Sequence, residues 1–153
     1  MLLKYGGTSA ALSFLISGCA STFSSSFKIH EADITKLKSF YVIKHEDDDR
    51  NTNVLIKDKL VKMGYKASTG QRANVPNDVD AVITYRDHWF WDITMFMLWL
   101  KVHIRTPQDG FPMARGESFR TSFARKSPEE MVNEVLEQLF KENLHKRAAT
   151  QIR

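Results

Sequence analysis

Residues 81–106 read AVITYRDHWFWDITMFMLWLKVHIRT, and this stretch decides the fold. Its β-branched and aromatic residues alternate with polar ones, which is the pattern of half-buried strands. We expect one strand over Ala81–Trp91 and a second over Thr94–Thr106, joined by a tight turn at Asp92-Ile93. The apolar run from Ile93 to Leu100 is far shorter than the ~20 residues that cross a bilayer as a helix, so we assign it to a strand.

A third strand is predicted over Met113–Phe123, after the turn Pro107-Gln108-Asp109-Gly110. The three strands then form an antiparallel meander. We align Trp99 with Phe119 and Lys101 with Glu117. This register points three small residues toward the core side of the sheet, namely Ala114, Gly116 and Ser118.

Upstream of the meander, the sequence predicts a strand, a helix and a strand. Ser39–His45 and Tyr65–Thr69 are rich in strand formers, and Asn51–Met63 carries apolar residues at helical spacing. Asn51 or Thr52 can cap the start of the helix and Gly64 can end it. The acidic run from Glu46 to Asp49, between the first strand and the helix, is expected to be a solvated turn.

The carboxyl-terminal part predicts a second helix. Ser127-Pro128-Glu129-Glu130 has the pattern of a capping box with proline at the first helical position. An apolar stripe follows at Val132, Val135, Leu136, Leu139 and Phe140. The fold class is therefore α+β: a β-α-β unit, then the three-strand meander and a C-terminal helix, with both helices packed on one face of the sheet.

Alternation along the meander separates a core face from an open face. The predicted core face carries Ala81, Ile83, Tyr85, Trp89, Phe96, Leu100, Val102 and Ile104. The predicted open face carries an apolar patch, edged by Arg86 and Lys101, that consists of Phe90, Met95, Met97, Trp99 and Phe119. Such patches mark interaction surfaces, although the tether or the carboxyl tail could instead cover this one. A register slip of one residue would exchange the two faces.

The amino terminus has the parts of a secretory signal. Lys4 precedes a short apolar segment over residues 10–16, and Ile16-Ser17-Gly18-Cys19 places small residues before the one cysteine of the chain. This stretch resembles the lipobox of bacterial lipoproteins. The alternatives are a plain signal peptide that happens to contain a cysteine, or a buried amino-terminal strand.

The resemblance implies a diacylglycerol thioether on Cys19 and an acylated amino terminus after cleavage, so that the protein contacts the membrane through lipid. Ala20 stands where an aspartate would resemble an inner-membrane retention signal. The resemblance therefore implies the periplasmic face of the outer membrane.

The domain organisation follows from this resemblance and from the strand and helix pattern. We expect a signal peptide over 1–18, the lipidated cysteine and a flexible tether over 19–35, one periplasmic α+β domain over 36–145 and a frayed basic tail over 146–153. The element pattern is similar to that of small α+β domains in periplasmic lipoproteins of proteobacteria. That similarity implies a recognition or accessory module without enzyme activity.

Charge and motifs favour no catalytic class. The net charge of +4 is spread over strand and helix faces, so we expect no nucleic-acid partner. His88 with Asp92, and His45 with Asp47–Asp49, lack the ligand spacing of a zinc or calcium site. No nucleophile elbow or phosphate-binding glycine loop is present. We expect no metal and no cofactor.

The sequence therefore predicts a non-enzymatic lipoprotein that binds another cell-envelope component. The partner is a periplasmic protein, an outer-membrane protein or a second copy of the chain. The alternative is a small-ligand-binding lipoprotein that uses the open sheet face as a pocket floor.

Overall fold

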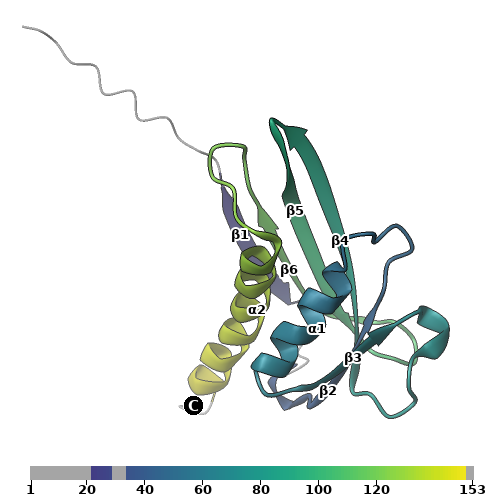
Figure 1. Cartoon of the computed structure of the whole chain (residues 1–153). Coiled ribbons are helices and arrows are strands. Elements are labelled where there is room, and N and C mark those ends of the chain that lie inside the picture. Colours follow the sequence, from purple (N-terminus) through teal and green to yellow (C-terminus); the bar gives the residue numbers. More distant parts are fainter. Residues whose placement is uncertain (1–21, 29–33, 151–153) are drawn as a thin grey trace, which may run out of the picture.

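The computed structural model describes residues 22–28 and 34–150, which form one six-stranded sheet with two helices on one face (Figure 1). The strand order across the sheet is β1-β6-β5-β4-β2-β3. Short 3-10 turns, η1 and η2, lie at Ile34–Lys36 and Arg72–Asn74. The longer elements are β1 (Phe23–Lys28), β2 (Ser39–Ile43), α1 (Thr52–Lys62), β3 (Lys66–Gly70), β4 (Ala81–Asp92), β5 (Thr94–Arg105), β6 (Pro112–Phe119) and α2 (Pro128–Thr150).

The topology confirms the α+β class. Strand β2 pairs in parallel with both β3 and β4, and α1 connects β2 to β3 as the predicted β-α-β unit. Strands β4, β5 and β6 form the predicted antiparallel meander. The expected pairs Trp99–Phe119 and Lys101–Glu117 are both present.

Residues 23–28, predicted to belong to a flexible tether, instead form strand β1. Phe23–Lys28 pairs antiparallel with β6 and forms an edge of the sheet. Its serines make this possible: Ser24 donates a hydrogen bond to the Gln138 side chain of α2 at 2.5 Å, and Ser25 donates to Glu117 of β6 at 3.2 Å. Small side chains here let the helix approach while the backbone completes the ladder.

The start of α1 also differs from expectation. Asn51 has a left-handed backbone, with φ of 59°, and makes no side-chain cap. The Asp48 carboxylate, from the acidic run, instead accepts the backbone N–H groups of Thr52 at 3.2 Å and Asn53 at 3.1 Å. Asp48 is therefore buried rather than solvated. Gly64, with φ of 91°, ends the helix as predicted.

Helix α2 begins with the predicted capping box. The Ser127 N–H donates to the Glu130 carboxylate at 2.7 Å, and the Glu130 N–H donates to Ser127 Oγ at 3.2 Å. The helical backbone continues to Thr150, beyond residue 145, where the predicted domain ends and the predicted tail begins. Strand β6 ends at Phe119, before the predicted Phe123. The next residue, Arg120, is buried and pairs with Glu134 of α2.

The hydrophobic core lies between the two helices and the sheet. Leu60 of α1 and Leu139 of α2 are both buried there, as their places in the apolar stripes predict. The predicted small residues of β6 also face α2: a Cβ added at Gly116 would lie 2.9 Å from side-chain atoms of Val135 and Leu139. A glycine at this position allows α2 to pack closely on the sheet.

A β-bulge changes the predicted faces near the end of the β4–β5 hairpin. His88 pairs with Trp99, but the next residue of β4, Trp89, pairs with Met97, which leaves Leu98 as an extra residue. One extra residue inverts the alternation beyond it. Met97, predicted on the open face, is therefore fully buried in the core. Phe96, predicted in the core, is buried, but it pairs with Phe90 on the opposite face, where the Arg125 guanidinium lies 4.4 Å from the centre of its ring.

Candidate interaction surface

Four aromatic side chains form a row across the sheet face that the helices do not cover. The register aligns Phe23 of β1, Phe119 of β6, Trp99 of β5 and His88 of β4. The Phe23 and Phe119 rings stack with centroids 5.6 Å apart, and the His88 and Trp99 rings stack at the same separation. We call these four residues the aromatic row. Stacked rings add to strand pairing and present a flat apolar surface.

Charged side chains lie next to the aromatic row on the same face. The next register row contains Ser25, Glu117, Lys101 and Arg86. The Lys101 ammonium lies 5.1 Å from the centre of the Trp99 ring and 3.9 Å from a Glu117 oxygen. The cation on Trp99 is therefore Lys101, one of the two residues predicted at the edge of the patch. A cation over the ring limits the movement of both side chains.

Further along the open face the surface is basic. Arg115 pairs with His103, and the Arg105 guanidinium donates to Thr84 Oγ1 at 3.4 Å. Burial, followed by the nearby positive charges of Arg105, Arg115 and Lys101, lowers the pKa of His103. The imidazole is therefore neutral at pH 7, and the positive character of this region comes from the arginines and lysine.

The residues predicted for the open-face patch divide into three groups. Trp99 and Phe119 lie together in the aromatic row, with Arg86 in the adjacent row. Phe90 lies on the open face nearer the end of the hairpin. Met95 pairs with Trp91 on the helix side of the hairpin, and Met97 belongs to the core, because of the bulge.

The end of the β4–β5 hairpin is a second apolar feature, which we call the hairpin tip: Phe90, Trp91, Ile93 and Met95. Their exposed fractions are 48%, 66%, 86% and 43%. Figure 1 shows this hairpin projecting beyond β1 and β6. Ile93 forms the turn with φ of 61°, a left-handed conformation that a β-branched residue rarely adopts.

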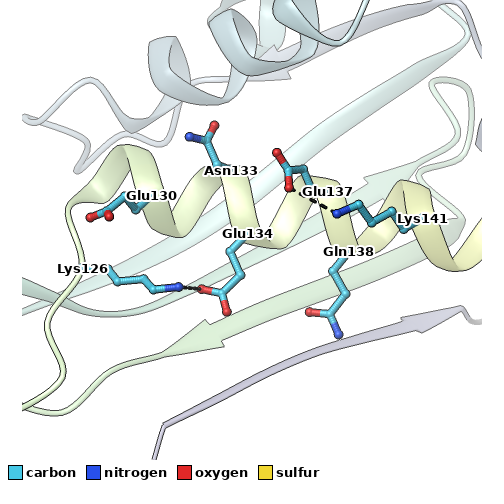
Figure 2. A pocket seen from close by; sticks show the side chains of 7 residues that line it. All are labelled: Lys126, Glu130, Asn133, Glu134, Glu137, Gln138 and Lys141. Atoms are coloured by element: carbon cyan, nitrogen blue, oxygen red, sulfur yellow. Dashed lines mark hydrogen bonds and ion pairs between the residues drawn. The ribbon is translucent and has the colours of Figure 1, made fainter.

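A shallow groove of about 510 Å³ lies along α2, lined by polar side chains (Figure 2). Its carboxylates already have partners within the fold. Glu134 binds Arg120 and Lys126, and Glu137 binds Lys59 and Lys141. Burial raises the pKa of Glu134, but hydrogen bonds from Arg120 and Lys126 outweigh it and hold the pKa below its usual range. These ion pairs connect α2 to its neighbours and give the groove a structural role.

Several sequence-based expectations concern sites that the structure tests only in part. Cys19 and the lipobox lie outside the described residues. Within residues 22–28 and 34–150, no cluster of three His, Cys, Asp or Glu side chains could hold a metal ion. No helix in the same part of the chain is long and apolar enough to cross a membrane.

Two members of the aromatic row were not predicted. Phe23 lies in a serine-rich stretch whose composition favours a tether. In the structure, Ser24 and Ser26 pair with Ser118 and Gly116, so the small side chains of this strand point inward. The contact of His88 with Trp99 depends on the exact register of β4 and β5. That register follows from the bulge, which leaves no clear sequence signal.

No family model and no curated protein sequence matches the chain. Among solved structures, the PelC dodecamer of Paraburkholderia phytofirmans aligns with a TM-score of 0.57 at 12% identity, over 78% of this chain and 98% of PelC. A substituted form of that dodecamer aligns with a TM-score of 0.56 at 11% identity, over 77% and 97%. A minor lipoprotein of Acinetobacter baumannii aligns at 16% identity over 73% and 96%, but its TM-score of 0.35 is too low to indicate a shared fold. The chain is thus similar in fold to PelC.

Proposed function

We propose that this chain is a non-enzymatic accessory lipoprotein of the cell envelope, held at the periplasmic face of the outer membrane by acyl groups on Cys19. In this proposal the open face of the sheet binds another envelope protein. The observation that carries the proposal is the aromatic row, which lies on the one sheet face that the helices leave uncovered. Aromatic side chains on such a face are typical anchors of protein interfaces.

The charges of the open face indicate the charge of the partner surface that would fit it. Arg86, Lys101, Arg105 and Arg115 lie on β4, β5 and β6, against the carboxylate of Glu117. Complementary charge steers partners and selects among them. The surface that fits here is therefore acidic at its rim and apolar where it meets Trp99 and Phe119.

A second copy of the chain is the first partner to test. The PelC structures with a similar fold are dodecamers, which supports assembly as a use of this fold without carrying PelC's role over to this chain. The small-ligand alternative requires a concave site. The groove in the described part of the chain lies along α2 and not on the open face, so that alternative gains no support from it.

The test is native mass spectrometry of the full-length protein extracted from membranes. One spectrum measures the mass added at the mature amino terminus and shows how many copies or partner chains remain bound. We expect an acylated Cys19 and an assembly that Lys101→Glu weakens, most strongly at low salt where charge attraction is least screened.

The matched control is Lys62→Glu, which makes the same charge change at an exposed position on α1. It should leave the assembly intact. A mature terminus without acyl groups would contradict the anchoring. An assembly that responds equally to both substitutions, or a monomer without partner, would contradict the role of the open face.

A further inference from the structure

We propose that the hairpin tip is a second membrane contact, in which Trp91, Ile93 and Met95 enter the interfacial layer of the membrane that holds the acyl groups of Cys19. This inference rests on the proposed lipidation. It adds a contact made by the folded domain itself and fixes which end of the domain faces the bilayer.

The hairpin tip is apolar at a place where turns are normally polar. A tight hairpin turn with positive φ favours glycine, asparagine or aspartate. Here Ile93 holds φ of 61° with 86% of its surface exposed, next to Trp91 at 66%. An aliphatic residue at a strained turn and an exposed tryptophan are unfavourable in water alone. They suit the membrane interface, where tryptophan is enriched and apolar side chains reach the acyl boundary.

The start of β1 and the hairpin tip lie at the same end of the sheet. Phe23, the first residue of β1, is in register with Phe119, Trp99 and His88. The next row of the open face, through Ser25 and Arg86, lies farther from the tip. The amino-terminal end of β1 therefore lies toward the tip end of the sheet (Figure 1).

The distances along the chain agree with this arrangement. Cys19 is four residues before Phe23, which spans at most about 14 Å of extended chain. On β4, three residues separate His88 from Trp91, or about 10 Å, and five separate it from Ile93, or about 17 Å. A membrane surface that contains the lipidated cysteine can therefore also contain Trp91 and Ile93.

The hairpin tip carries little net charge. Asp92 is the only acidic residue between His88 and Leu100 in the sequence. Its side chain is 3.2 Å from the Arg125 guanidinium, which also donates to the Asp92 carbonyl at 2.7 Å and to Thr94 Oγ1 at 2.5 Å. The pairing neutralises the carboxylate, which would otherwise oppose transfer toward lipid. The same contacts hold the tip in place from the loop that follows β6.

The experiment places a fluorophore at the tip of the intact, acylated protein. Ile93→Cys introduces a thiol for a polarity-sensitive label, since Cys19 is the only cysteine of the natural chain and its sulfur is consumed by lipid. The protein is reconstituted in phosphatidylethanolamine–phosphatidylglycerol vesicles. Val61→Cys is the matched control, a half-exposed β-branched residue near the end of α1. Met95→Cys supplies a second position on the tip.

We expect emission from the labels at 93 and 95 to shift to the blue and to be lost with brominated acyl chains. The label at 61 should instead be quenched by aqueous iodide. Iodide quenching at 93 and 95 equal to that at 61 would overturn the inference. A label at 93 shielded from both quenchers would mean that protein, such as a second copy, covers the tip, and would also overturn it.

Labelling of the natural chain, without an introduced cysteine, distinguishes failure of the membrane contact from failure of the proposed anchoring at Cys19. An acylated Cys19 takes up no label. Labelling of the natural chain would show a free thiol and would contradict both proposals, whereas an unlabelled natural chain with a water-exposed tip contradicts the membrane contact alone.

Discussion

Asp48 shows how one residue joins a loop, a helix and the sheet. Its carboxylate accepts backbone N–H groups of Arg50, Thr52 and Asn53 and the hydroxyl of Tyr85 on β4. Burial raises the pKa of Asp48, but these hydrogen bonds outweigh it and hold the pKa below its usual range. Burial and the hydrogen bond to Asp48 raise the pKa of Tyr85. The first turn of α1 is therefore fixed by an ionised carboxylate.

We expect Asp48→Asn to lower the free energy of unfolding by about 1.5–3 kcal/mol at pH 7, the range for hydrogen bonds to a charged group. A carboxyl with a lowered folded-state pKa stabilises the fold above its unfolded pKa of about 3.9, and this contribution is lost as the pH falls through the folded value. The difference between the two proteins should therefore shrink below about pH 4.

Denaturant unfolding at several pH values measures this effect. Asp47→Asn, a change at the exposed neighbour, should stay within about 0.5 kcal/mol of the natural protein. Equal effects of the two substitutions would show that the Asp48 network does not hold the helix.

For single residues, the sequence predicts the acidic turn but not that Asp48 binds the start of α1. The four consecutive acidic residues from Glu46 to Asp49 look alike in the sequence. Only the position of the loop relative to α1 and Tyr85 buries Asp48 and leaves Asp47 and Asp49 exposed. The glycine that ends α1 and the capping box of α2 were predictable because they act on neighbours a few residues away.

Strand β1 is the element on which composition and structure differ most. A serine-rich segment has little apolar surface to bury, which favours a tether. The free edge of β6 nevertheless offers backbone partners, and Gln138 of α2 binds Ser24 from the helix side. The edge of β6 is therefore covered by β1, whose residues are small and have low strand propensity.

Hydrogen–deuterium exchange tests this element. We expect roughly half of the amides of residues 23–28 to be protected, since an edge strand bonds alternate groups to its neighbour. The loop over residues 71–80, most of which is exposed, supplies the reference for rapid exchange. Exchange of residues 23–28 as fast as that loop would show that they form a tether after all.

The β4–β5 hairpin was predicted from the sequence, but its bulge was not. The short turn at Asp92-Ile93 makes β4 and β5 neighbours, as predicted. The faces of the residues before the bulge follow from the alternation of apolar and polar residues. The extra residue at Leu98 comes from pairing across two strands, so it moves Met97 and Phe96 to faces that periodicity alone assigns wrongly.

At the scale of the whole molecule, the sheet separates two kinds of surface. One face is sealed by α1 and α2, whose contact includes a 2.6 Å ion pair between Lys59 and Glu137. The other face carries the aromatic row and the basic rows beside it. The class of fold and the helix-covered face were predictable from periodicity, whereas the composition of the open face depended on β1 and on the register.

We propose that Trp99 acts in partner binding on the open face, whereas Leu60 stabilises the core. The most direct measurement is a paired comparison of Trp99→Ala and Leu60→Ala in chemical unfolding and in capture of the partner or second copy per folded molecule. Leu60→Ala should lower the free energy of unfolding by about 2–5 kcal/mol, because its side chain is fully buried. Trp99→Ala should cost clearly less stability but weaken capture by about 2 kcal/mol or more. If Trp99→Ala instead unfolds the domain and leaves capture unchanged, the account is contradicted.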